Sequence, residues 1–343
     1  MKSTRVRRVP VVAATLAATA ILVTACSSSS SSSSAPSAST SSSASTSASA
    51  ASSPSSSSTA ATTSIVVGAL PVLDTAGLQV AIKEGFFAQA GLNVTVKSVA
   101  QSTVAIPDLL HGSIDIIGGG NYVSFLEAQA NGAFPVQFLA PAVDCTATDY
   151  GVVALPSSGI TTAAGLAGKT IAVNLTKNIQ TLTTDAVLKS EGVGAVSYVQ
   201  IPFPDMVSAL KAGRVSAISV VEPFLAAALK AGGKLVTSTC TGPTADFPMS
   251  GYITTQTWSQ QHPAAAAAFQ KALEEGNAYA DANPSVVRSV LPTYTSLTAA
   301  AAASVPLGDY PSTLTTAPLQ RIATLMKGSG LATPSNLSAL LLG

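Results

Sequence analysis

The chain has 343 residues, a formal net charge of +1 and only 10% charged residues. No basic patch interleaved with aromatic residues stands out, so the composition argues against a nucleic-acid partner. About 280 residues follow the first 64, which is the usual size of two α/β lobes.

Residues 1–25 have the pattern of a targeting segment. A basic start is followed by the apolar run Val9 to Ala25, which is short for a membrane span of about 20 apolar residues. The run ends in Val23-Thr24-Ala25-Cys26, which resembles a bacterial lipobox. We therefore expect a signal peptide, lipidation of Cys26, and a protein anchored on the extracytoplasmic face of the cell membrane. The alternative is an ordinary secretory signal with an incidental cysteine.

Residues 26–64 follow as a predicted tether. From Ser27 to Ser64 the chain is almost entirely Ser, Ala and Thr without charges, so it cannot bury enough apolar surface to order itself. A flexible segment of this length has an r.m.s. reach of roughly 30–35 Å. That reach would hold a folded domain just off a membrane.

From Ile65 on, short apolar runs alternate with helical patterns, which predicts mostly parallel sheets. The first series predicts strands at 65–70, 92–96, 114–117 and 136–139, and helices at 75–87, 102–111 and 121–130. A second series after Gly159 predicts strands at 169–173, 197–201, 215–220 and 234–237, and helices at 179–191, 206–212 and from 222. The end of the chain predicts a strand at 250–255 and helices at 263–281, 283–291 and 318–327.

The two series predict two lobes that face each other across a cleft. We expect a first lobe at 65–156, a second at 157–247, and a return to the first at 248–343 through a hinge. The two halves share a similar segment, since Leu110 to Ile116 and Lys211 to Ala217 have the same Gly-x-apolar-polar-apolar core.

Five motifs occur in the order seen in one known group of proteins. They are Gly85-Phe86-Phe87, Gly91-Leu92-Asn93-Val94, Gly112-Ser113-Ile114-Asp115, Leu166 to Val173, and Val221-Glu222-Pro223-Phe224. From Ile65 to about Met326 the chain resembles the nitrate/sulfonate/taurine-type binding proteins of ABC importers, a group that includes thiamine-pyrimidine-precursor binders. The resemblance implies an α/β, two-lobed, type II periplasmic-binding-protein fold with mixed, mostly parallel sheets, which closes on a small molecule by hinge bending.

The same resemblance implies the partners and the absence of catalysis. We expect a monomer that serves an ABC permease and its ATPase, with no cofactor and no metal. The departure from the family pattern is Ser216, where a second Asp would be expected.

Ligands of open α/β sheets bind beyond the carboxyl ends of strands, so the candidate residues lie at strand-to-helix junctions. In the first lobe they are Pro71, Asp74, Thr75, Gly119, Gly120 and Asn121. Asp74 would receive an amine or amide, unless it only caps the next helix. The glycines would let backbone N–H groups approach a ligand, unless they only form a tight turn.

In the second lobe the candidates are Asn174, Thr176, Asn178, Thr181, Glu222 and Phe224. The Asn and Thr side chains suit oxygen-rich groups such as a sulfonate, although Asn178 also reads as a helix cap. Glu222 would bind a donor or cation beside an apolar wall formed by Phe224, unless it only precedes a first-turn proline.

These candidates include two acids and no Arg, with Lys177 the one nearby cation. A taurine-like zwitterion or a nitrogen heterocycle such as a thiamine pyrimidine therefore fits better than nitrate.

Two cysteines are left once Cys26 is assigned to the anchor. Cys145 and Cys240 follow the last predicted strands of the two series, so a disulfide between them would stiffen the hinge. Two free thiols are the alternative.

An enzyme and a surface scaffold are the competing functions. A fungal pyrimidine synthase resembles these binders, but the chain has no cysteine cluster, and its two histidines, His111 and His262, read as surface residues. Nucleophile-elbow, phosphate-loop and zinc-ligand spacings are absent from the sequence. A scaffold would leave a hinged cleft without a use.

Overall fold

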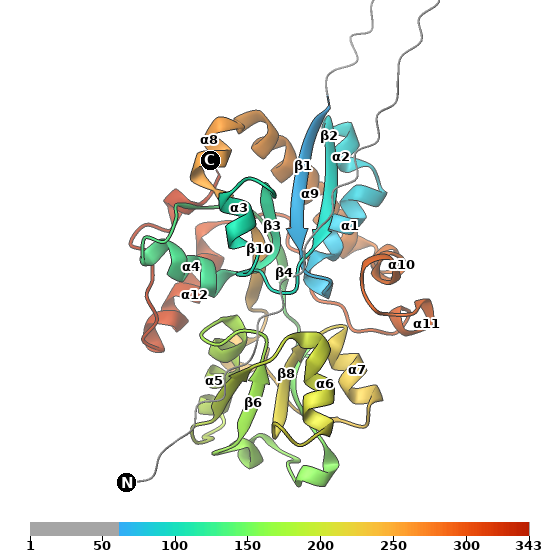
Figure 1. Ribbon diagram of the computed structural model, residues 1–343, viewed down its shortest axis with the longest axis vertical. Helices are drawn as coiled ribbons and strands as arrows, with labels where there is room; N and C mark the ends of the chain where they lie inside the picture. The colour runs from blue at the N-terminus through green and yellow to red at the C-terminus, as the bar shows by residue number, and fades with distance from the viewer. Residues whose placement is uncertain (1–61, 343) are drawn as a thin grey trace, which may run out of the picture. The chain divides into compact units, whose positions relative to one another are not determined.

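Two five-stranded sheets organise the computed structural model, which describes residues 62–342 (Figure 1). The first sheet has the order β2-β1-β3-β10-β4, and its strands are β1 (Thr63–Ala69), β2 (Leu92–Ser98), β3 (Ile116–Asn121), β4 (Val136–Asp144) and β10 (Pro248–Thr255). Its first three strands are parallel, and β10 lies antiparallel between β3 and β4.

The second sheet has the order β7-β6-β8-β5-β9. Its strands are β5 (Tyr150–Ala154), β6 (Thr170–Val173), β7 (Ser197–Gln200), β8 (Ala217–Val221) and β9 (Lys234–Ser238). β6 is parallel to β7 and β8, whereas β5 runs antiparallel to both β8 and β9. The two mixed sheets confirm the predicted α/β, two-lobed fold.

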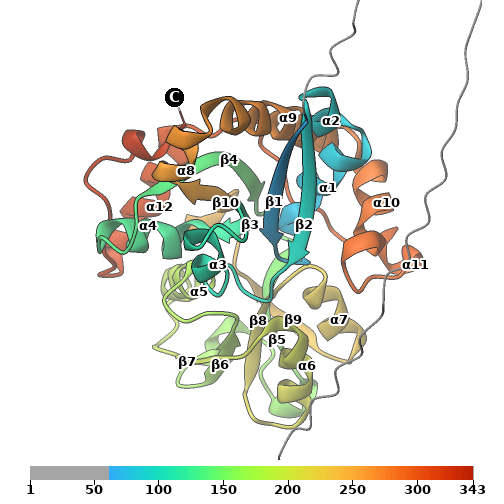
Figure 2. The ribbon, with the colours of Figure 1, turned by 45° about the horizontal axis from the view of Figure 1, so that its top comes forward.

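Helices cover both faces of the first sheet (Figures 1 and 2). One face packs on α1 (Ala76–Lys83), α2 (Phe86–Gln89) and α9 (Pro263–Ala282), where Leu78 and Phe269 meet Ile65 and Tyr252 in a buried core. The other face carries α3 (Ile106–Leu110), α4 (Tyr122–Ala130) and α12 (Thr316–Gly328). The helices α8 (Gln256–Gln261), α10 (Pro284–Tyr294) and α11 (Ala299–Ala302) complete this lobe.

The second sheet lies between α5 (Ile179–Ser190) and the pair α6 (Phe203–Lys211) and α7 (Phe224–Lys230). Leu188 of α5 belongs to a core with Ile171 and Ala217, while Met206 and Leu225 belong to a core with Ile218. Successive residues of β8 thus point to opposite faces, as strand geometry requires.

The chain crosses between the sheets at 145–149 and again at 239–247. Cys145 and Cys240, one on each crossing, form a disulfide with an S–S distance of 2.01 Å and a Cα–Cα distance of 6.0 Å. Near the first crossing, Asp144 and Asp309 form an isolated antiparallel bridge, so the segment before α12 also lies against this connection. The disulfide therefore links the two inter-lobe connections that would form the hinge.

Ser58–Gly343 forms one compact unit that contains both sheets, the disulfide and three hydrophobic cores. All of these interactions lie within residues 62–342, so we expect the unit to fold without the residues that precede it. The expected signal peptide, Cys26 and nearly all of the expected tether lie outside the described residues. Among the described residues, no helix has the length and apolar character needed to cross a membrane.

The structure differs from the sequence-based expectations at four places. β5 was not predicted, because its fully buried run from Tyr150 shows no alternation. The helix predicted at 75–87 breaks at Gly85, which has φ +79°. The helix predicted at 121–130 is α4, with Asn121 as its N-cap, but Gly118 to Asn121 extend β3 beyond the predicted strand end at 117. The helix predicted at 102–111 is shorter, since α3 begins at Ile106 with Ala105 as its N-cap.

Candidate functional site

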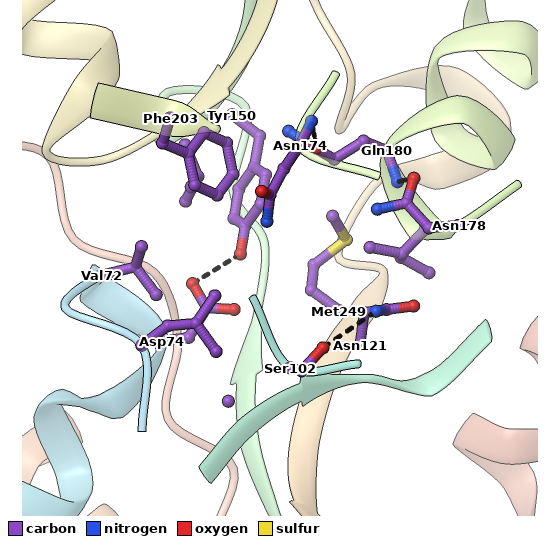
Figure 3. A pocket seen from close by; sticks show the side chains of 14 residues that line it. Val72, Asp74, Ser102, Asn121, Tyr150, Asn174, Asn178, Gln180, Phe203 and Met249 are labelled. Carbon is purple, nitrogen blue, oxygen red and sulfur yellow. Dashed lines mark hydrogen bonds between the residues drawn. The ribbon is translucent and has the colours of Figure 1, made fainter. Parts of the chain in front are cut away.

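A small cavity lies between the two sheets, where strands end and helices begin (Figure 3). Its volume is about 40 Å³, room for roughly three water molecules. The residues that line it are Leu70, Val72, Asp74, Ser102, Gly119, Asn121, Tyr150, Asn174, Asn178, Ile179, Gln180, Phe203, Val221 and Met249. Both sheets contribute, so the cavity is the floor of an interlobe cleft.

Asp74 provides the carboxyl group of the cavity. Its Oδ1 accepts a hydrogen bond from the Tyr150 hydroxyl at 2.7 Å, and its Oδ2 accepts one from the Ser250 hydroxyl at 2.6 Å. Burial raises the pKa of Asp74, and these two hydrogen bonds oppose that rise. Asp74 does not cap α1, whose N-cap is Thr75. The hydrogen bonds from Tyr150 and Ser250 thus hold the Asp74 side chain at the cavity.

The second lobe presents amide groups to the cavity. Gln180 Oε1 accepts from the backbone N–H of Asn174 at 2.8 Å, while its Nε2 donates to the Ser219 carbonyl at 3.0 Å. Asn178 caps α5 by accepting from the N–H groups of Gln180 and Thr181. The Nδ2 groups of Asn174 and Asn178 have no hydrogen-bond acceptor within residues 62–342, which leaves two donors beside the N-terminus of α5.

The first lobe adds a polar edge from β3. Asn121 accepts from the N–H of Ser124 at 2.9 Å, which caps α4, and donates from Nδ2 to Ser102 at 3.3 Å. Gly119 has φ +68°, and a Cβ there would lie 2.8 Å from Thr75 Cγ2. Glycine is therefore needed at 119 both for the backbone conformation and for the approach of the η1 turn (Leu73–Thr75).

An apolar wall faces these polar groups. Phe203, the first residue of α6, lines the cavity and stacks on Phe224, the first residue of α7, with ring centroids 5.1 Å apart and an interplanar angle of 13°. Met249 of β10 lies on the side of Asn121 (Figure 3). A ligand would thus meet amides and a carboxyl on some sides and an aromatic ring on another.

Hydrogen bonds between the lobes hold the cleft closed. Gln101 Nε2 donates to the carbonyl oxygen of Asn174 at 2.6 Å and to its Oδ1 at 3.1 Å. On another side, the N–H of Leu73 donates to the carbonyl of Glu222 at 3.1 Å. Together with the contact between Tyr150 and Asp74, these bonds join the lobes around the cavity, so a larger ligand enters only when they open.

The structure places five of the twelve predicted ligand residues on the cavity: Asp74, Gly119, Asn121, Asn174 and Asn178. Phe224 reaches it only through Phe203. Thr75 instead donates to the carbonyls of Leu70 and Val72, and Gly120 packs within the sheet. Pro71 and Glu222 lie outside the lining.

Thr176 and Thr181 line a separate groove of about 280 Å³ that also includes Lys177 and Leu331. Glu222 is buried, with a pKa raised to about 7 by desolvation, and its Oε2 accepts from the N–H of Ala226. The Glu222 side chain thus bonds to the backbone at the start of α7 and does not line the cavity.

Several lining residues were missed at the sequence level. Phe203 follows β7 and opens a helix, so the same junction rule could have found it. Tyr150 and Met249 lie on the strands that carry the chain between lobes, and only the three-dimensional pairing brings them to the cavity.

The charge of the cavity is carried by Asp74 alone, since no Lys, Arg or His lines it. Within residues 62–342, no group of three or more His, Cys, Asp or Glu side chains is arranged to hold a metal ion. The arrangement can bind a small molecule that donates to a carboxyl and accepts from amides.

Two lobes, a hinge and an interlobe cavity define the class of periplasmic binding proteins. The family comparison agrees, since residues 73–286 match the model of the NMT1/THI5-like family. The chain belongs to this family, as its five sequence motifs predicted.

Solved structures share the fold at low sequence identity. The ligand-binding component of an ABC-type import system from Staphylococcus aureus, with zinc bound, has a TM-score of 0.71 and 16% identity over 81% of this chain and 96% of that one. The alkanesulfonate-binding protein SsuA from Xanthomonas axonopodis pv. citri, bound to MOPS, has a TM-score of 0.67 and 18% identity over 81% and 97%. None of the curated proteins compared with the chain matches it.

The same fold also occurs in an enzyme. The desulfurization enzyme DSZB has a TM-score of 0.58 and 18% identity over 81% of this chain and 95% of that one. At these identities the likeness extends to the fold alone, so function has to be argued from the cavity.

Proposed function

We propose that this chain is an extracytoplasmic solute-binding lipoprotein, anchored through Cys26, that captures a small organic molecule and delivers it to an ABC permease. The observation that carries the proposal is the cavity enclosed between two hinged lobes, with polar groups from both. Binding sites of this kind close around their ligand, which links recognition to a change of shape that a permease can sense. The protein acts as a monomer and has no catalytic role.

The polar groups favour a ligand with different chemistry at its two ends. Asp74 accepts hydrogen bonds, so it suits an ammonium or N–H group. Asn174 and Asn178 offer amide donors beside the N-terminus of α5, a position that favours a negative group by about 0.3–1 kcal/mol. A taurine-like aminosulfonate would place its ammonium at Asp74 and its sulfonate at Asn174 and Asn178.

A nitrogen heterocycle such as a thiamine-pyrimidine precursor is the second candidate. Phe203, already stacked on Phe224, offers a preformed aromatic surface for a planar ring. Asp74 would accept from an exocyclic amine of such a ring. Nitrate fits poorly, because no cation lines the cavity to balance its charge.

Thermal unfolding of the unit Ser58–Gly343 with taurine, an alkanesulfonate, a 4-aminopyrimidine and nitrate tests the proposal. A ligand that binds only the folded state raises Tm, and at about 100 times its Kd it adds about 2.7 kcal/mol of stability. We expect taurine or the aminopyrimidine to raise Tm. A response to nitrate alone would contradict the ligand class, and no response to a broad panel of metabolites would favour a scaffold.

A further inference from the structure

The rim of the second lobe that lies farthest from the cavity carries a concentration of positive charge. The cavity contacts the starts of α5 and α6 and the end of β8, so the opposite ends of these elements lie at the far rim. α5 has 12 residues and is therefore about 18 Å long, which separates this rim from the ligand site. The rim consists of residues 154–169, 189–197, 211–216 and 229–235, in the lower part of Figure 1.

Six cations and one anion occupy this rim, which we call the basic rim. The cations are Lys169, Lys189, Lys211, Arg214, Lys230 and Lys234, and all six are exposed. The anion is Glu191, whose Oε1 accepts from Thr237. None of the six cations forms a salt bridge or a side-chain hydrogen bond within residues 62–342. Six cations minus one anion leave the rim a net charge of about +5, and no salt bridge within the described lobe offsets it.

The cations lie close together because the sheet order places them so. Lys169 precedes β6, Arg214 lies shortly before β8, and Lys234 begins β9. The strand order β6-β8-β5-β9 separates these positions by at most three strand spacings, about 14 Å. A glycine with positive φ lies within three positions of a rim cation in each connection, at Gly168, Gly192, Gly213 and Gly232.

Helix electrostatics explains only half of this pattern. Lys189, Lys211 and Lys230 lie in the last turns of α5, α6 and α7, where cations complement the helix dipole. Lys169, Arg214 and Lys234 lie beyond the helices and gain nothing from that effect. The corresponding rim of the first sheet has mixed charges, since Lys83 is 3.9 Å from Glu84, and Asp108 and Asp115 lie near the start of β3.

Exposed apolar side chains accompany the charge. Leu229 is 41% exposed and Leu235 is 43% exposed, and each is the neighbour in sequence of a rim cation. Large exposed apolar residues are few in the described chain, so two of them at one basic rim are informative. Basic side chains with interspersed leucines match a surface that has negative headgroups above an apolar layer.

We propose that the basic rim binds the anionic headgroups of a lipid surface, with Leu229 and Leu235 reaching into the interfacial layer. This contact is independent of the ligand cavity, which lies at the opposite end of the lobe. It orients the second lobe toward the membrane whether or not the cleft is closed.

Co-sedimentation of the unit Ser58–Gly343 with lipid vesicles tests this inference. The vesicles contain phosphatidylcholine alone or with about 30% phosphatidylglycerol, at about 50 mM and about 300 mM salt. We expect binding to the anionic vesicles at least ~10-fold tighter than to the neutral ones at low salt, with most of the difference lost at high salt. The variant K211Q/R214Q/K230Q/K234Q removes four rim charges and should lose most of this preference.

A matched control removes the same number of charges elsewhere. K83Q/K97Q/K271Q/K327Q changes exposed lysines of the first lobe and should keep the preference for anionic vesicles. L229S/L235S keeps every rim cation and should weaken binding severalfold, and circular dichroism verifies that each variant is folded. Equal binding to neutral and anionic vesicles, or equal losses in the rim and control variants, would overturn the inference. So would binding to an acidic polypeptide such as polyglutamate without binding to vesicles.

Discussion

Tyr150 donates a hydrogen bond of 2.7 Å to Asp74, a residue 76 positions earlier in the chain and in the other lobe. The bond places the one carboxyl of the cavity at the meeting point of the two lobes, beside the crossing at 145–149. Closure of the lobes and the position of the ligand-binding carboxyl are therefore coupled through Tyr150.

Removing the Tyr150 hydroxyl tests this coupling. Tyr150→Phe keeps the ring but leaves Asp74 with one of its two side-chain partners, and a hydrogen bond to a charged group is worth about 1.5–3 kcal/mol. We expect ligand affinity to fall by about tenfold or more, as measured by calorimetric titration with the ligand identified in the thermal screen. Tyr198→Phe, which removes a bond to Asp185 away from the cavity, should leave affinity unchanged. Equal losses in the two variants would argue against the coupling.

Gln101→Ala should open the cleft. The substitution removes both bonds from Gln101 to Asn174, and each contributes about 0.5–1.5 kcal/mol. The equilibrium between closed and open forms then shifts toward open, so small-angle X-ray scattering should give a larger radius of gyration without ligand. Gln320→Ala, on the exposed side of α12, serves as the control. An unchanged radius in Gln101→Ala would show that other contacts set the closure.

The disulfide should contribute substantially to stability. Cys145 and Cys240 are 95 positions apart, and closing a loop of that size stabilises the folded state by about 4–5 kcal/mol in the chain-entropy description. Cys145→Ser/Cys240→Ser should therefore unfold at clearly lower urea concentration than the parent unit. Adding a reductant should lower the midpoint of the parent and leave that of the double variant unchanged. The same midpoint in both proteins would mean that the disulfide does not stabilise the fold.

Asp149 should make stability depend on pH. Desolvation raises its pKa from 3.8 to about 7, and its Oδ2 has no hydrogen-bond partner among the described residues. The folded state therefore holds the proton more tightly than the unfolded chain. This contribution is fully present below about pH 4 and is lost as pH rises through about 7. At about 1.4 kcal/mol per pKa unit, the loss is on the order of 4 kcal/mol.

Urea unfolding at pH 5 and pH 8 tests this expectation. Asp149→Asn cannot ionise, so its free energy of unfolding should fall less between the two pH values than that of the parent. Glu222, with a pKa of about 7, and Asp144, with a pKa of about 6, act in the same direction, so some pH dependence will persist. Asp108→Asn, at an exposed position, should behave like the parent. If the free energy of unfolding of Asp149→Asn fell as much between pH 5 and pH 8 as that of the parent, Asp149 would not be the source of the pH dependence.

Much of the fold could be predicted from the sequence, because apolar runs and helical spacing are local signals. The long helices α9, α10 and α12 and the parallel strands fall close to their predicted positions. β5 could not be recognised, since a short buried antiparallel strand has no alternation, and its partners β8 and β9 come much later in the chain.

A site residue was predictable only where it lies at a strand-to-helix junction and its side chain also points into the cavity. Asn178 shows this, since it caps α5 and also lines the cavity. Glu222 shows the limit, because it stands at a junction while its side chain turns back to Ala226. Gln101 had no signal at all, since it acts across the cleft on Asn174 and only the folded chain brings the two together.

Native mass spectrometry of the unit Ser58–Gly343 from its own host tests the central claim most directly, with the unit compared with its Asp74→Asn variant. The account predicts that the parent carries a bound small molecule and that the variant, which lacks the cavity's carboxylate, loses most of it. The variant must first be shown to be folded by circular dichroism. A molecule bound equally to both proteins, or none bound to the parent in the presence of a broad metabolite panel, would contradict the claim that this cavity binds a ligand through Asp74.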